Sequence, residues 1–255
     1  MAFDMNNFVI DRIIRGVALS QKDDSVLFSI NQIQNASLNC ASESTDAVDA
    51  MGTPIATFYR AKSAEFSAEN ALFDMNLMAT QLGTSKKVAS STSKITAPAM
   101  ESFTVVEGGK YELKHAPKTA PTEIYALNSD STFGVKYVQK TAADAESFAI
   151  AGQTITLPTG IAAGTEMFVM YEYETDQAVE VVNSAKNFPV GCKFVMEVLG
   201  CDVCDQTNLV YAYVIFNNAK LSPDFDWSIA TDGTHPFSMK AQQDLKYRSL
   251  AAQAA

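Results

Sequence analysis

Two long extended runs follow one another near the start of the chain. From Ser25 to Ala41 the even positions are mostly apolar and the odd positions are small and polar, which is the period of a β-strand with one wet face. The segment Gln32–Gln34 interrupts this alternation, so we expect a bulge or bend there. A turn cluster beginning at Asp49 leads into a second extended run that continues to about Ala68. Together the runs predict a hairpin much longer than the usual five or six residues per strand.

The second run alternates less cleanly than the first. Its even positions place Phe58 and Phe66 on one face, and Arg60 and Lys62 are expected to share that face. Charges on an otherwise apolar face indicate that the face leaves the core part-way and meets solvent or another subunit. A hairpin that outruns its own core exposes backbone edges that need a pairing partner. The plainer alternative is a hairpin that ends in a solvated loop.

A short helix is expected directly after the hairpin. In ALFDMNLMATQLG the apolar residues recur at helical spacing, with Asn70 placed to cap the N-terminus and Gly83 placed to cap the C-terminus. Such a helix would cover one side of a sheet. Residues 1–20 are mildly apolar, at spacings that fit a short helix or an arm laid on the rest of the protein.

The middle and end of the chain predict further strands. A hairpin is expected about Glu107–Gly109, and short strands separated by turn signals fill the segment from 122 to 175. This regular spacing is typical of all-β folds. We therefore predict a discontinuous β domain, residues 1–115 and 177–255, with an inserted β elaboration at 116–176 that is immunoglobulin-like or a small sandwich. The ending YRSLAAQAA is expected to be a frayed tail.

Composition narrows the function classes. The chain has 255 residues, of which 47% are hydrophobic and 19% charged, so it can bury a large core. Its net charge of −10 argues against a nucleic-acid-binding surface, which needs clustered Lys and Arg. No apolar run is long enough for a membrane span. The start MAFDMNNFVIDRIIRG lacks the features of a signal peptide, so folding in a cytoplasm is expected.

The cysteines are compatible with three interpretations. They are Cys40, Cys192, Cys201 and Cys204. The last two have the two-residue spacing of zinc ribbons and redox motifs, but a second such pair is missing. A metal or redox role, a disulfide, and free thiols are the alternatives, and the missing pair favours free thiols.

Candidate catalytic residues are lacking. His115 and His235 sit in turn-like surroundings without a neighbouring nucleophile, and surface or turn positions are expected for both. Motifs for an activated serine, a phosphate-binding glycine loop or a zinc protease are missing too. We expect no enzyme activity, no cofactor and no bound metal.

Two stretches carry a family resemblance. DAMGTPIATFYRAKSAEFSAENALFDMNLMATQLG resembles the hairpin-then-helix core of tailed-bacteriophage major tail tube proteins. NNAKLSPDFDWSIATDGTHPFSMKAQQDL is similar to the closing strands of phage tail structural proteins. The resemblance implies a mostly β fold, a two-sheet β-sandwich or half-barrel with a long hairpin and one flanking α-helix. It also implies hexameric rings stacked into a hollow tube, in which hairpins of neighbouring subunits line a channel.

The resemblance further implies location and partners. The protein would belong to the virion tail and assemble in the cytoplasm of a host bacterium. Its partners would be copies of itself, other tail proteins such as sheath, tape measure or terminator, and DNA that passes without sequence recognition. The alternatives are another phage structural protein, such as a head decoration, connector or baseplate component, and a non-viral β-sandwich binding module.

The expected interface and channel lining lie on the hairpin and its approach. A neutral-polar strand face suits a wet channel, and an acidic protein with few lysines would not bind DNA that passes through it. The candidate residues are Ser29, Asn31, Asn35, Ser37, Asn39, Asp46, Asp49, Tyr59, Arg60, Lys62 and Glu65.

Overall fold

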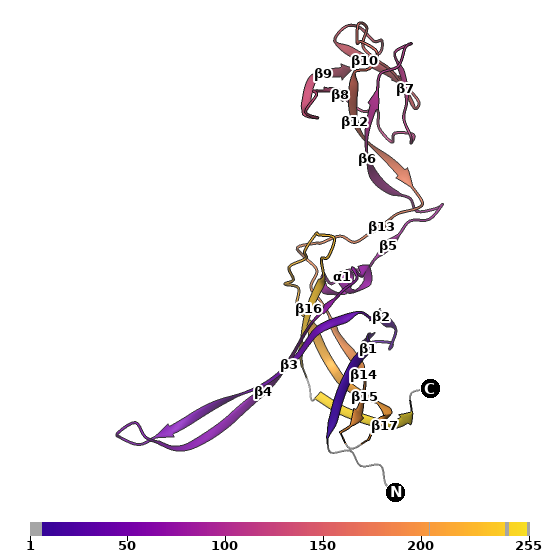
Figure 1. Ribbon diagram of the computed structural model, residues 1–255. Helices are drawn as coiled ribbons and strands as arrows, with labels where there is room; N and C mark the ends of the chain where they lie inside the picture. Colours follow the sequence, from indigo (N-terminus) through magenta and orange to yellow (C-terminus); the bar gives the residue numbers. More distant parts are fainter. Residues whose placement is uncertain (1–6, 204, 243–244, 254–255) are drawn as a thin grey trace. The chain divides into compact units, whose positions relative to one another are not determined.

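The computed structural model describes residues 7–203, 205–242 and 245–253. Strands dominate it, and α1 (Met75–Gln81) is the single helix among these residues (Figure 1). This confirms the predicted mostly β class with one helix. The chain divides into two compact units, each with its own core. The large unit comprises Met1–Lys86 and Val181–Ala255, and the small unit comprises Lys87–Glu180.

The small unit starts earlier than the predicted insertion at 116–176. Phe103 and Leu113 precede residue 116, yet they are buried together with Ile124 and Phe148 in the core of the small unit. The boundary therefore moves to Lys87. Two short strands, β5 (Lys87–Val88) and β13 (Val179–Glu180), pair where the chain enters and leaves this unit.

Eight strands form the sheet of the large unit, in the order β2-β1-β14-β15-β16-β4-β3 with β17 paired to β15. β2 and β3 stand at opposite ends of this order although they follow one another in the chain. β1 also contacts β3, so the sheet curls into a half-barrel. The strands are β1 (Phe8–Ser20), β2 (Val26–Ile30), β3 (Ile33–Val48), β4 (Pro54–Asn70), β14 (Gly191–Asp202), β15 (Asp205–Leu221), β16 (His235–Ala241) and β17 (Leu245–Gln253).

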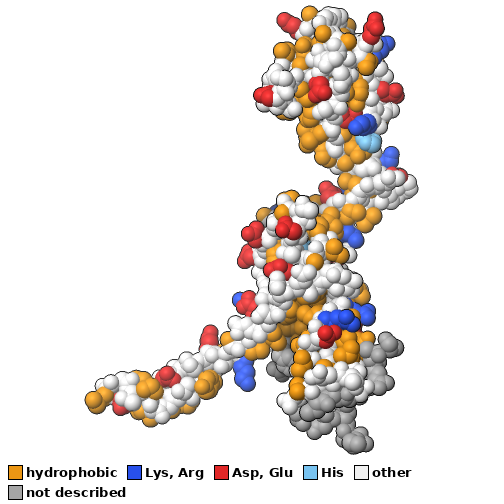
Figure 2. All heavy atoms as spheres, viewed as in Figure 1, with side chains coloured by type: hydrophobic (Ala, Val, Ile, Leu, Met, Phe, Trp, Pro, Cys, Tyr) orange, Lys and Arg blue, Asp and Glu red, His pale blue; other side chains and the backbone are white. Residues whose placement is uncertain are grey.

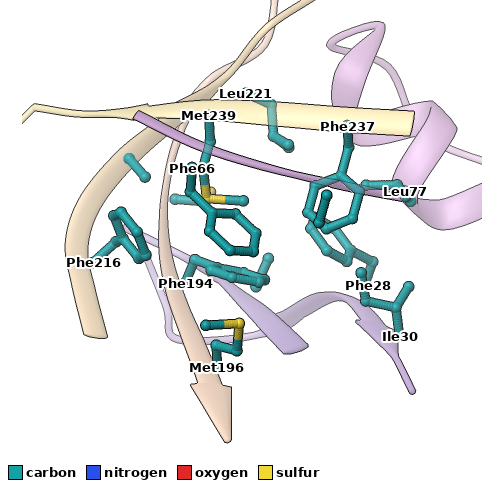
Figure 3. Close-up of a cluster of buried hydrophobic side chains, with 14 of the residues drawn as sticks. Phe28, Ile30, Phe66, Leu77, Phe194, Met196, Phe216, Leu221, Phe237 and Met239 are labelled. Atoms are coloured by element: carbon teal, nitrogen blue, oxygen red, sulfur yellow. The ribbon is translucent and has the colours of Figure 1, made fainter. Parts of the chain in front are cut away.

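The core of the large unit is built around Phe66 of β4. Its ring lies 5.8 Å from that of Phe194 on β14 and 5.9 Å from those of Phe216 on β15 and Phe237 on β16 (Figure 3). Leu77 closes the cluster from α1 and is fully buried. Burying each such side chain contributes roughly 1.5–3 kcal/mol, so this cluster fixes the root of β4 in the sheet.

The helix begins later than predicted. Asp74 caps it, because its carboxylate accepts hydrogen bonds from the backbone N–H groups of Asn76 (2.9 Å) and Leu77 (2.7 Å). The predicted cap, Asn70, instead ends β4. Gly83 follows the last turn with φ of 65°, the left-handed conformation expected of a C-terminal glycine.

The two ends of the chain also form strands in the described residues. β1 pairs with β14 where a helix or docked arm is predicted, and bulges at Asp11 and Ile14 blur its period of two. Because each bulge adds one residue, the apolar spacing resembles that of a helix. β17 pairs with β15 from Phe216↔Leu245 onward, so the predicted frayed tail is wrong as far as Gln253.

The small unit contains seven strands in the order β6-β12-β8-β9-β10-β11-β7, in which β9 and β10 are parallel. The predicted hairpin about Glu107–Gly109 does not form, because β6 pairs with β12 and β7 pairs with β11. The strands are β6 (Ile95–Thr104), β7 (Lys110–Glu112), β8 (Glu123–Leu127), β9 (Phe133–Gln139), β10 (Ser147–Ala151), β11 (Thr154–Thr156) and β12 (Glu166–Thr175).

A buried carboxylate ties this second core together. Glu101 of β6 is 3% exposed and accepts hydrogen bonds from the hydroxyls of Tyr111 (2.7 Å) and Tyr171 and from the backbone N–H of Lys114 (3.1 Å). Burial opposes its ionisation, but these donors outweigh burial and lower its pKa. Burial and the bond to Glu101 raise the pKa of Tyr111 to about 12. The network therefore holds a charged carboxylate in the core.

Candidate assembly interface

The β3–β4 hairpin leaves the core of the large unit as a free two-stranded ribbon. Phe66 is buried and Leu38 half-buried, whereas every side chain from Asn39 to Ser63 is exposed. The segment Asn39–Ser63 is named the arm. About ten residues per strand at roughly 3.3 Å each carry the arm about 30 Å past the core. Figure 1 shows this ribbon running away from the other strands of its unit.

A tight turn held by Asp49 closes the arm. Its carboxylate accepts hydrogen bonds from the backbone N–H groups of Met51 (2.8 Å) and Thr53 (2.9 Å). These bonds, that of Thr53 first, lower the pKa of Asp49. Gly52 has φ of 84°, and a Cβ there would meet nothing within 4 Å. The backbone conformation alone therefore calls for glycine at this position.

A bulge changes the predicted faces of the arm. Ser42 pairs with Lys62 but Glu43 pairs with Arg60, so Ala61 is an extra residue, with φ of 36°. The extra residue reverses the alternation of β4 beyond it. Lys62 shares the face of Phe66, as predicted, whereas Arg60 and Phe58 lie on the opposite face. The prediction that all four share one face is therefore wrong.

The backbone edges of the arm are unpaired in the described chain. β3 is the last strand of the sheet and pairs with β4 alone. β4 pairs with β16 only from Glu65 to Asn70, so its outer edge is free from Pro54 to Ala64. Both edges present N–H and C=O groups to a further strand. A two-stranded hairpin is at best marginally stable in water, so pairing with further strands would stabilise the arm.

Large apolar side chains gather toward the end of the arm. Met51 is 91% exposed in the turn, and Tyr59 is 73% exposed on β4. Val48, Ile55 and Phe58 are also more than half exposed. Figure 2 shows hydrophobic side chains at this end of the ribbon. Exposed apolar side chains gathered at one end of the arm, on both of its faces, favour a contact site over a solvated loop. The candidate residues chosen from sequence miss four of these five, although apolar residues flanking a turn are a usable signal.

Charge on the arm is sparse and mixed. It carries the acids Glu43, Asp46 and Asp49 and the bases Arg60 and Lys62. Glu43 pairs with Arg60 across the two strands, so opposite charges stand side by side. Long-range repulsion between two such arms is therefore weak.

The structure brings most of the predicted site residues onto the hairpin, and all of them are exposed. Asp46, Tyr59 and Lys62 lie on the face of Phe66 that leaves the core. The opposite face and the tip hold Ser37, Asn39, Asp49, Arg60 and Glu65.

Two predicted residues lie off the hairpin, and a third lies at its root. Ser29 is on β2 and Asn31 is in the β2–β3 connection, at the other end of the sheet order. Asn35 sits at a bulge near the root of β3, with φ of 50°, and donates a hydrogen bond to Glu69 (3.3 Å). The predicted single run from Ser25 to Ala41 is thus two strands, with a break at Asn31–Gln32 and a bulge after Gln34.

The cysteines in the described residues are free thiols. Cys40 is exposed on the arm, Cys201 is half-buried, and Cys192 is buried. Burial raises the pKa of Cys192 to about 11. Cys204, the other half of the predicted pair, lies outside the described residues. Among residues that the structure describes, no group of three or more potential metal ligands occurs.

The two histidines have different environments. His115 is exposed and stacks on Tyr173. His235 is 1% exposed, which corrects the predicted surface position, and its Nε2 lies 2.8 Å from the side-chain oxygen of Gln81. Burial lowers the pKa of His235, and the nearby charge of Asp74 acts in the opposite direction. This histidine is a packed core residue.

Comparison with known protein families gives a match over nearly the whole chain. A family model described as the YomU/Tube protein family matches residues 8–250. No curated protein matches the chain. The matched range includes the whole small unit, the complete arm and all of the large unit except its first seven and last five residues. None of the helices that the structure describes is long and apolar enough to span a membrane.

Proposed function

The chain belongs to the YomU/Tube protein family, and from this premise we propose that it is the major tail tube subunit of a tailed bacteriophage. In this proposal it polymerises as hexameric rings stacked around a channel for DNA. The observation that carries the proposal is the arm, which is exposed along its whole length and has two edges that pair with no further strand among the residues described. A ribbon of this length contributes no buried side chain to the core of its own subunit.

Edge pairing between copies would make a closed barrel. The β3 edge of one arm would add to the β4 edge of the next, and both junctions would be antiparallel because β3 and β4 are antiparallel within each arm. This contact is heterologous, since it joins two different surfaces, so it can close into a ring. Closure removes every free edge, with each copy contributing two strands.

The apolar end of the arm supports the same assembly. Met51, Phe58 and Tyr59 are exposed in the single chain and would be covered by a neighbouring copy. Burial of this surface is the main favourable term in protein association. The mixed, sparse charge of the arm allows several copies to approach one another.

The charge balance supports DNA passage without binding. The net charge is −10, and the arm carries only two basic residues, one of which, Arg60, stands opposite the acid Glu43 in the β3–β4 register. Phosphate binding requires clustered cations, so DNA would slide through such a channel. The face that includes Ser37 and Asn39 also holds charges of both signs, those of Glu43, Arg60 and Glu65, and such a polar face would suit a wet lining.

The proposed setting follows from this role. The protein would assemble in the host bacterial cytoplasm and reside in the virion tail, in contact with tail proteins such as sheath, tape measure or terminator. We propose no catalytic activity and no cofactor for it. The burial of His235 and its contact with Gln81 support a structural role for that side chain.

Removing the arm tip tests the proposal. Deletion of Thr45–Thr53 takes away exposed residues only, so the variant should remain a folded, soluble protein. The wild-type chain at high concentration should form long hollow tubes or hexameric rings in negative-stain electron microscopy, and the deletion should stop their formation.

A matched control carries two additional glycines after Gly160, in an exposed turn of the small unit. It should form the same tubes as the wild type. Normal tubes from the tip deletion, or a wild-type chain that stays monomeric at every concentration, would overturn the proposal.

A further inference from the structure

A groove in the small unit has no part in the arm-based assembly. It has a volume of about 420 Å³ and opens to solvent. Residues from the end of β12, the segment after it, and the segments before β6 and after β7 line it. Its lining residues are Lys94, His115, Ala116, Tyr173, Glu174, Thr175, Asp176 and Gln177. A concave site with an aromatic surface and a few polar groups is the usual form of a small-ligand site.

An aromatic platform forms one wall of the groove. The rings of His115 and Tyr173 are stacked, with centroids 4.0 Å apart and planes inclined by 4°. Tyr173 is half-buried and pairs with Ala97 of β6, which fixes its backbone. The backbone N–H of His115 donates to the hydroxyl of Tyr171 (3.0 Å). The backbones of both residues are therefore fixed, and the stacking sets their two rings parallel.

Polar side chains of both hydrogen-bonding types surround this platform. The carboxylates of Glu174 and Asp176 accept hydrogen bonds, the ammonium of Lys94 donates them, and the amide of Gln177 does both. Glu174 is oriented by an ion pair with Lys118 (3.3 Å). Charges of both signs occur, so neither an anion nor a cation is favoured strongly.

We propose that this groove binds a neutral saccharide. The flat C–H face of a pyranose ring packs on aromatic rings, and its adjacent hydroxyls both donate and accept hydrogen bonds. The small unit has seven lysines and no arginine against twelve acidic residues, which disfavours anionic ligands. The inference rests on the groove alone and does not depend on tube assembly.

Saturation-transfer NMR on the full-length protein tests this inference. The probes are maltohexaose, cellohexaose, mannohexaose and chitohexaose, each at millimolar concentration, and the method works for single chains and for assemblies alike. At least one probe should show saturation transfer to its ring C–H protons. The affinity measured for that probe should fall at least tenfold in His115→Ala.

Matched variants separate the groove from the rest of the surface. Phe133→Ala removes an aromatic ring that is 59% exposed outside the groove, and it should leave affinity unchanged. Gln177→Ala keeps the platform but removes a polar group, and it should also weaken binding. Thermal unfolding of each variant shows whether the small unit stays folded.

Three results would overturn the inference. The first is no saturation transfer to any of the four probes. The second is binding that His115→Ala and Gln177→Ala leave unchanged while both variants are folded. The third is a groove that binds inorganic phosphate or a short peptide in place of the saccharides.

Discussion

Two phenylalanines of the same strand have opposite roles in the proposed assembly. Phe66 is 1% exposed at the root of β4, whereas Phe58 is 57% exposed on the arm. Truncating Phe66 to alanine in the core should cost about 3–5 kcal/mol of unfolding free energy. Phe58→Ala should change it by less than about 0.5 kcal/mol, because the ring contacts little in the single chain.

Assembly should show the reverse order. With about 200 Å² of surface on a buried phenylalanine, the exposed 57% of Phe58 leaves about 110 Å² for a neighbour to cover. At about 25 cal/mol per Å² this burial is worth about 2.8 kcal/mol, of which alanine would retain a fraction. A loss of about 2 kcal/mol per contact corresponds to about a 30-fold rise in the critical concentration for polymerisation.

Sedimentation of tubes over a dilution series measures the critical concentration, and urea unfolding below that concentration measures stability. Phe133→Ala is the control, because Phe133 is exposed to the same degree (59%) on the small unit, and it should leave the critical concentration unchanged. If Phe58→Ala polymerises at the wild-type concentration, or unfolds as easily as Phe66→Ala, the assigned role of the arm is wrong.

Three further predictions concern the two cores. Tyr171→Phe removes one donor to the buried carboxylate of Glu101 and should lower the unfolding free energy of the small unit by about 1.5–3 kcal/mol, as measured by urea unfolding. Gly83→Ala should destabilise the large unit by at least about 1 kcal/mol in the same assay, because φ is 65° and the new Cβ would clash with the carbonyl oxygen of Phe188; an unchanged midpoint would contradict this. Burial lowers the pKa of His235 in the folded protein. Below about pH 6.5 the histidine therefore binds a proton more readily in the unfolded chain than in the folded one. The unfolding free energy should then fall as the pH drops from about 7.5 towards about 5. His235→Gln should remove that part of the pH dependence, as shown by unfolding curves of both proteins at each pH.

Local patterns in the sequence were sufficient for the β class, the long hairpin and the presence of a helix. Alternation around Leu38 and Phe66 and the turn at Asp49 depend on neighbouring residues only, so they can be read without knowing the fold. The helix was predicted from its apolar spacing and from Gly83. Its N-terminal cap is Asp74 rather than Asn70, because the carboxylate of Asp74 accepts hydrogen bonds from two backbone N–H groups. The four-residue error in the start arose because Asn70 also suits a cap.

Strand pairing could not be predicted from local patterns. Whether β6 turns back on β7 or pairs with β12 depends on segments more than sixty residues apart in the chain. The start of the small unit also depends on contacts between distant segments. Phe103 belongs to this unit because it packs against residues of the small core that follow it in the chain. Alternation shows that a strand has two faces, but only its partners show which face is buried.

The sequence by itself determined that this protein has a hairpin too long for its own core, because strand length and turn position depend on residues that are consecutive in the chain. Only the tertiary structure decided where the arm begins and which side chains share a face. The bulge at Ala61 shifts the register by one residue, and that shift moves Phe58 and Arg60 to the face opposite Phe66. A one-residue shift leaves little trace in the pattern of apolar residues, yet it decides which surface the arm offers to a neighbouring copy.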